Sequence, residues 1–148
     1  MTDARTPRGR VVAAARGWLG TPYHHQASLR GVGCDCLGLV RGVWRDLYGK
    51  EPEQMPAYSP YWAQQGSGET LALAAERHLR PLDPRDARPG DVLLFRWRGH
   101  LPAAHCAVLV EPDRILHAHD GAAVSEVAFT GWWRRHLSHA FAFPEIDL

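Results

Sequence analysis

The chain has 148 residues, of which 45% are hydrophobic and 22% are charged. This length and composition are typical of a single domain, here residues 1–148, and they exclude a disordered chain. Seventeen Lys and Arg residues nearly balance 16 Asp and Glu residues, and because no segment concentrates the basic residues we expect no binding to nucleic acid.

Targeting signals are missing from the sequence as given. It contains no apolar run of the roughly 18 residues that a membrane span needs, and the first ten residues lack the apolar segment of a secretory signal. We therefore expect synthesis in the cytoplasm without a signal peptide and no insertion into a membrane. The odd number of cysteines, three, indicates reduced thiols rather than disulfides.

Three helices are predicted in the first half of the chain. Apolar residues recur at helical spacing over residues 8–18, and a polar loop over residues 23–33 leads to a second helix that begins near Cys36 and ends at Tyr48-Gly49. Residues 51–68 contain three prolines, two glycines and several aromatic residues, which predicts a surface loop. A short third helix is expected over residues 69–79, and prolines keep the chain irregular from there to Gly90.

The second half of the sequence consists of short apolar runs separated by turn signals. Strands are expected over residues 91–95, 105–110, 114–119, 122–127 and 140–143. The intervals between most of them are too short for the helices of parallel βαβ units, so the sheet should be antiparallel. The sequence therefore predicts an α+β fold with a helical N-terminal half.

Cys36 is the first candidate for a reactive residue because it lies where the polar loop meets the second helix. The N-terminus of a helix favours a thiolate and presents N–H groups that can bind an oxyanion. Asp35, directly before it, is suited to cap the helix. A small buried cysteine with no chemical role is the alternative. Cys34 lies in the loop and Cys106 in an apolar strand, on the face opposite to His105, so we expect structural roles for both.

A cysteine nucleophile needs a base, and His105 is the best placed of nine histidines because it begins the most continuous apolar strand. A three-residue turn, residues 111–113, is expected to precede the strand that holds His117. A loop with an odd number of residues places His105 and His117 on one face as diagonal neighbours. His119 shares that face directly opposite His105, so spacing leaves open which of the two orients the base.

The same residues raise the alternative of a metal site. Cys34, Cys36, His105, His117 and His119 are all of types that bind zinc. Their CxC and HxH spacings differ from the gaps of structural zinc sites. We therefore expect no metal and no cofactor.

Five segments in a fixed order carry a resemblance to a known family. They are Gly20-Thr21-Pro22-Tyr23, the DCLGLV segment that begins at Asp35, the PGDVLLF segment that begins at Pro89, the strand that begins at His105, and Leu116-His117-Ala118. This ordered set resembles the NlpC/P60 family of papain-like cysteine peptidases. The resemblance implies that Cys36 is the nucleophile, His105 the general base and His117 the residue that orients the base. It also implies that Tyr23 and Asp35 contribute to substrate binding.

The resemblance implies an activity as well. Members hydrolyse stem-peptide bonds of bacterial peptidoglycan, typically between D-glutamate and a diamino acid. The likeness is closest to a branch encoded with phage tails and gene transfer agents, in which a pair like His25-Gln26 follows the first motif. This implies tail proteins as partners and delivery to the cell wall by a phage-like particle. The alternatives are a catalytically silent tail protein on the same fold and a papain-like amidase or acyltransferase.

Two departures from the family pattern concern the pocket. Leu37 replaces a serine, and Cys106-Ala107 replaces Val-Gly after the histidine. The aromatic loop over residues 51–68 and the segment Trp132-Trp133-Arg134-Arg135 lie outside the motifs. We expect packing for the tryptophans, with contacts to glycan or to a tail protein as alternatives.

Overall fold

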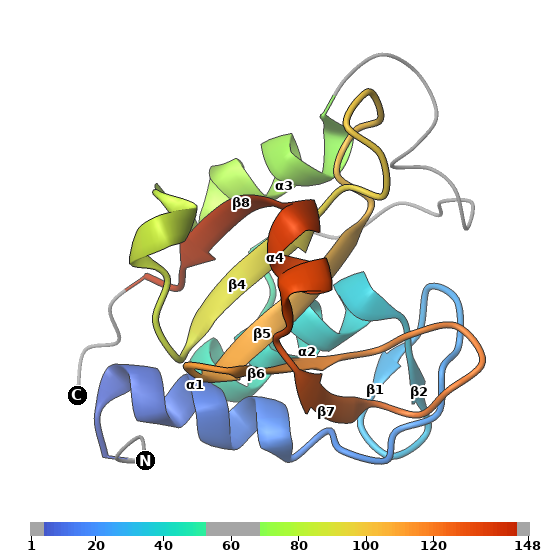
Figure 1. Cartoon of the computed structure of the whole chain (residues 1–148). Coiled ribbons are helices and arrows are strands. Elements are labelled where there is room, and N and C mark those ends of the chain that lie inside the picture. Colours follow the sequence, from blue (N-terminus) through green and yellow to red (C-terminus); the bar gives the residue numbers. More distant parts are fainter. Residues whose placement is uncertain (1–4, 53–68, 145–148) are drawn as a thin grey trace.

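The computed structural model describes residues 5–52 and 69–144. Its central element is a six-stranded sheet with helices on both faces (Figure 1). The strands of this sheet are β3 (Arg80–Leu82), β4 (Asp91–Phe95), β5 (His105–Glu111), β6 (Arg114–His117), β7 (Ser125–Ala128) and β8 (Leu137–Ala142). They lie in the order β3-β8-β4-β5-β6-β7, and every neighbouring pair is antiparallel.

The remaining elements surround this sheet. The helices are α1 (Pro7–Arg16), α2 (Cys36–Tyr48), α3 (Thr70–His78) and α4 (Gly131–His136), with one 3-10 turn, η2 (Pro84–Asp86). A separate two-stranded sheet consists of β1 (Ser28–Leu29) and β2 (Gly33–Cys34). Among the helices in the described ranges, none combines the length and apolar character needed to cross a bilayer. The predicted α+β fold with an antiparallel sheet is confirmed.

Strand alternation divides the core into two layers. Cys106 and Val108 of β5 point to the face that α1, α2 and α3 cover, where they join buried side chains of all three helices. Ala107 and Leu109 point to the opposite face, where Trp133 of α4 packs. Figure 1 shows α4 in front of the sheet and α2 behind it. The two faces of β5 therefore belong to different cores.

The three predicted helices appear where the sequence places them. The predicted helices over residues 8–18 and 69–79 correspond to α1 and α3, and the second predicted helix corresponds to α2. Gly49 ends α2 with a φ of 84°, a left-handed conformation that glycine adopts without strain. Of the predicted loop over residues 51–68, residues 53–68 lie outside the described part of the chain.

Short elements account for the differences. β1 and β2 lie in a segment that we predicted to be a loop, β3 lies in the proline-rich segment, and α4 was missed. Strands of only two or three residues are too short to show an alternating apolar pattern in the sequence. Pro81 is compatible with β3 because that strand lies at the edge of the sheet, where a missing N–H donor on the outer side costs no ladder hydrogen bond. The predicted strand over residues 114–119 ends at His117, the next begins at Ser125, and the last begins at Leu137 rather than at residue 140.

Candidate active site

Cys36 is the first residue of α2, and Asp35 is the N-cap of this helix. The Gly38 N–H donates to Oδ1 of Asp35 at 2.7 Å, and the Gln26 N–H donates to Oδ2 at 2.8 Å. The predicted cap is confirmed. Because Asp35 is 4% exposed and both carboxylate oxygens accept backbone hydrogen bonds, its main role in the structure is to hold the loop and the helix start together. Its contact with substrate stays a prediction.

The loop before α2 packs directly against the first helical turn. A Cβ on Gly38 would lie 1.9 Å from the carbonyl oxygen of Ala27, so only glycine permits this approach. The Ser28 hydroxyl donates to the carbonyl oxygen of Gly38 at 2.6 Å. These contacts determine where the helix begins, and with it the position of the Cys36 thiol.

The thiol of Cys36 is the acidic one of a pair. The thiol of Cys106 donates a hydrogen bond that lowers the pKa of Cys36 well below its usual range, and hydrogen bonding and charge from His105 act in the same direction. Burial opposes these effects but does not outweigh them. The pKa of Cys106 is raised, first by its hydrogen bond to Cys36 and then by burial. These opposite shifts favour the thiolate at Cys36 and the protonated thiol at Cys106.

Sequence reasoning missed the contact between Cys106 and Cys36. The prediction that Cys106 lies in the core is confirmed, since it is 2% exposed. Its side chain points to the face of β5 opposite to His105, as predicted, and α2 packs on that face. The sequence does not show which face of β5 the helix α2 covers, and this decides whether Cys106 meets Cys36. Cys34 is fully buried in β2, and burial raises its pKa to about 12, as expected of a structural thiol.

His105 and His117 form a buried pair of imidazoles. Nε2 of His105 and Nδ1 of His117 are 2.9 Å apart, so one nitrogen donates and the other accepts. Burial, with smaller contributions from the nearby His105 and His119, lowers the pKa of His117 to about 4. His119 is exposed, and its ring centroid lies 6.0 Å from that of His105. Of the two candidates left open by spacing, His117 is therefore the hydrogen-bonded partner.

The hairpin that joins the two histidines differs from the prediction. Glu111 pairs with Arg114, so the turn has two residues rather than three. A bulge between Leu109 and Glu111 shifts the register by one residue, and beyond it Val108 pairs with Leu116. Without the bulge, a two-residue turn would place the two imidazoles on opposite faces. The predicted diagonal relation is thus confirmed, but its cause is the bulge.

Aromatic side chains surround the imidazole pair. Trp97 stacks on His105 with ring centroids 5.3 Å apart, and the ring centroid of Trp133 lies 5.2 Å from that of His117. The expectation of packing is confirmed for Trp133, whereas Trp132 is 45% exposed.

Tyr23 lies near the thiol of Cys36. Burial, together with the negative charge of Cys36, raises the pKa of Tyr23 to about 12. The Tyr23 hydroxyl therefore stays protonated at neutral pH.

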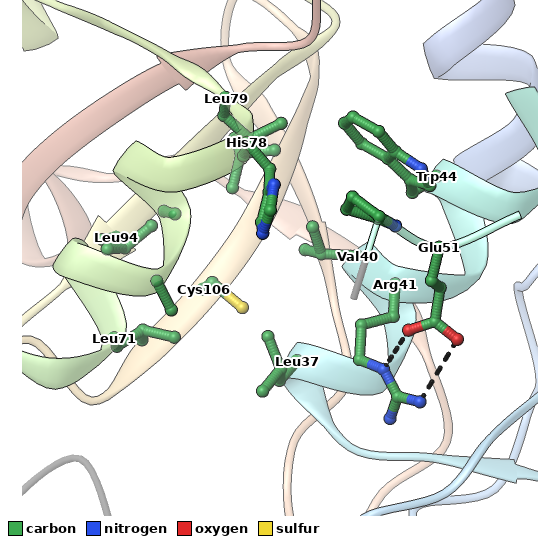
Figure 2. A pocket seen from close by; sticks show the side chains of 14 residues that line it. Leu37, Val40, Arg41, Trp44, Glu51, Leu71, His78, Leu79, Leu94 and Cys106 are labelled. Carbon is green, nitrogen blue, oxygen red and sulfur yellow. Dashed lines mark hydrogen bonds and ion pairs between the residues drawn. The ribbon is translucent and has the colours of Figure 1, made fainter. Parts of the chain in front are cut away.

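An apolar cavity of about 90 Å³ lies between α2 and α3 (Figure 2). Leu37 and Cys106, which neighbour the Cys36 thiol in sequence or in space, belong to its lining, as do Leu71 and Trp44. His105 and His117 do not line it. The cavity therefore lies on the helix-covered face of the sheet, beside Leu37 and Cys106, whereas the imidazoles lie on the other face. The sequence carries no signal for this cavity beyond the apolar stripe of the second helix.

Of the five residues considered as metal ligands, the three histidines lie together and the two cysteines do not join them. One nitrogen from each of His105, His117 and His119 lies within 4.8 Å of the others, and this is the one such cluster in the described residues. Cys34 and Cys36 are not part of it.

Comparison with known proteins identifies the class. The model of the NlpC/P60 family matches residues 20–141, and the chain belongs to this family. The α+β architecture is the papain-like fold of that family. Among curated proteins, no significant match was found.

Solved structures with this fold are distant in sequence. NlpC2 from Trichomonas vaginalis matches with a TM-score of 0.65 and 18% identity over 97% of this chain and 48% of that protein, so this chain spans about half of its length. The NlpC/p60 domain of the peptidoglycan hydrolase SagA matches with a TM-score of 0.61 and 19% identity, over 92% of this chain and 98% of that domain. RipB, a peptidoglycan hydrolase from Mycobacterium tuberculosis, matches with a TM-score of 0.57 and 20% identity, over 98% of this chain and 67% of that protein.

Proposed function

We propose that this protein is a cysteine peptidase that hydrolyses stem-peptide bonds of bacterial peptidoglycan. One observation carries the proposal. An acidified thiol at a helix N-terminus, Cys36, interacts with His105, and His105 in turn pairs with His117 at 2.9 Å. This is the nucleophile, base and orienter arrangement of covalent acyl transfer.

In the proposed reaction, the Cys36 thiolate attacks the carbonyl carbon of the scissile amide. The N–H groups of the first turn of α2 bind the oxyanion. When the tetrahedral intermediate collapses, the C–N bond breaks and His105 gives its proton to the leaving amine. Water, deprotonated by His105, then attacks the thioester and releases the acid together with the thiolate. His117 acts as a positioning residue that fixes the orientation of the His105 ring.

Family membership supports the choice of substrate. Two of the structurally similar proteins are peptidoglycan hydrolases, SagA and RipB. The bond we propose is the one between D-glutamate and a diamino acid, on the basis of the family resemblance. Tyr23, which lies near the thiol and keeps its hydroxyl proton, is proposed to line the substrate site.

We also propose that the enzyme reaches the wall as part of a phage-like tail after synthesis in the cytoplasm. The support is the likeness of the motif around His25-Gln26 to the tail-encoded branch. Mass spectrometry of purified particles tests this location directly. Particles that lack the protein while cells contain it would refute the proposed delivery.

Digestion of defined muropeptides tests the activity. The wild-type protein should release two products whose masses identify the bond, and Cys36→Ala should release none. Cys34→Ala is the matched control: it removes a buried thiol that does not take part in the proposed reaction, and it should keep most activity. A folded wild-type protein that leaves every stem peptide intact would favour the silent tail protein. A trapped thioester with another acyl donor would favour the amidase or acyltransferase.

A further inference from the structure

The imidazole cluster of His105, His117 and His119 extends the catalytic pair by one residue. His119 is exposed and lies beyond the end of β6, whereas the other two rings are buried. Continuing the register in which Val108 pairs with Leu116 places residue 119 opposite residue 105. The third ring therefore approaches the pair from the solvent side, and nitrogens from all three rings lie within 4.8 Å of one another.

This spacing is close to that of a metal site. Zinc binds imidazole nitrogen at about 2.0–2.1 Å, so two ligands in tetrahedral geometry lie roughly 3.3 Å apart. The nitrogens of His105 and His117 are 2.9 Å apart and need to separate by only a few tenths of an ångström. His119 lies two residues beyond the end of β6, and its side chain is exposed to solvent.

The ligand set selects the kind of cation. The cluster consists of three imidazoles without a carboxylate, which suits zinc and similar transition metals rather than Ca²⁺ or Mg²⁺. Three imidazoles with one open position also differ from the four-ligand structural sites to which the sequence spacings were compared. The spacing argument against a structural zinc site therefore does not apply to this cluster.

We propose that His105, His117 and His119 form a reversible Zn²⁺ site and that the bound ion inhibits the enzyme. The inhibition, but not the binding, rests on the proposed function. A zinc ion on these nitrogens replaces the hydrogen bond between His105 and His117. The positive charge of the ion also lowers the basicity of the His105 ring, so the ring no longer exchanges protons with the thiol and the leaving amine. His119 thus supplies a regulatory ligand without taking part in hydrolysis.

Calorimetric titration of the full chain with Zn²⁺ in metal-free buffer tests the site. The wild-type protein should bind one equivalent, and His119→Ala should weaken binding by at least about tenfold, since loss of a ligand should cost no less than loss of a residue that supports one. His100→Ala removes an exposed histidine outside the cluster and should bind like the wild type. Absence of binding to the wild type, or equal binding to His119→Ala, overturns the proposal.

Thiol ligands are the competing explanation for any zinc that binds. Cys36→Ala should retain binding if the three imidazoles hold the ion. Co²⁺ as a substitute should then give visible absorption bands without an intense near-ultraviolet band from thiolate. Loss of binding in Cys36→Ala together with full binding in His119→Ala would assign the ion to the thiols and overturn the proposal.

Activity measurements separate this proposal from the function on which it rests. Zinc should inhibit muropeptide cleavage by the wild type, a chelator should restore it, and His119→Ala should remain active at zinc concentrations that stop the wild type. Zinc binding that depends on His119 in a protein without peptidase activity would support the site and refute the proposed function. An active enzyme that binds zinc without loss of rate would refute the inhibition.

Discussion

Nε2 of His105 lies 2.9 Å from Nδ1 of His117 across the hairpin of β5 and β6. This contact depends on the bulge between Leu109 and Glu111, which brings the two side chains to one face of the sheet. The relation also explains why the pKa of His117 is low: the ring is buried beside another imidazole. A neutral His117 that accepts from or donates to His105 is suited to orient the base rather than to act as a second acid.

Substitution of His117 should therefore reduce turnover more than binding. We expect His117→Ala to lower kcat by about 10²-fold, because the His105 ring is no longer held in the productive orientation. His117→Asn retains a polar side chain and should recover part of the rate, with a pH–rate profile closer to that of the wild type. His119→Ala should leave the rate unchanged in metal-free buffer. Equal losses in His117→Ala and His119→Ala would contradict the assignment.

The acidified thiol predicts selective alkylation. At pH 6, iodoacetamide should modify Cys36 at least about tenfold faster than a free cysteine, whose pKa of about 8.5 leaves little thiolate at this pH. Cys34 and Cys106 should stay unmodified in the folded protein, because both are buried and have raised pKa values. Peptide mass spectrometry measures the three sites separately, and an unfolded sample serves as the control in which all three react.

The thiol of Cys106 should contribute to this reactivity. Cys106→Ala removes the hydrogen bond that most lowers the pKa of Cys36, and we expect that pKa to rise. Cys106→Ser keeps a donor at the same place and should shift the pKa less. The pH dependence of alkylation measures both variants. Identical profiles for wild type and Cys106→Ala would show that the hydrogen bond has no such effect.

Stability should depend on pH through His117. Its pKa falls from 6.5 to about 4 on folding, so between these values the unfolded chain binds a proton that the folded protein does not. The resulting stabilisation is fully present above pH 6.5 and is lost as the pH falls towards 4; it is on the order of 3 kcal/mol. Burial lowers the pKa of His139 too, which adds in the same direction.

Urea unfolding at several pH values isolates the contribution of His117. His117→Asn should show a smaller loss of unfolding free energy between pH 6.5 and pH 4 than the wild type, because His139 and the remaining groups are common to both proteins. Parallel curves for the two proteins would assign the pH dependence to other residues.

Gly38 should be indispensable for the start of α2. A Cβ at this position would lie 1.9 Å from the carbonyl oxygen of Ala27, so Gly38→Ala should destabilise the protein by about 1–3 kcal/mol and displace the loop beside Cys36. Gly99→Ala is the matched control, since a Cβ there meets nothing within 4 Å and stability should change by less than about 0.5 kcal/mol. Thermal unfolding and the alkylation rate of Cys36 report on the two effects.

The sequence by itself determined the long elements and the identity of the chemical groups. Helical spacing after Cys36 and unbroken apolar runs at residues 91–95 and 105–110 are local signals, and the structure has α2, β4 and β5 there. The capping role of Asp35 could be predicted as well, because a cap needs only neighbours in the chain. The family motifs combined these local signals into the expected set of Cys36, His105 and His117.

Only the tertiary structure decided how these groups meet. The bulge that aligns the two histidines leaves no period in the sequence, and the pairing of the Cys36 and Cys106 thiols depends on which face of β5 the helix covers. The same holds for the grouping of His119 with the buried imidazoles. Each of these contacts joins segments that are distant along the chain. The free energy of such a contact depends on side-chain packing and strand register, which no short stretch of sequence specifies by itself.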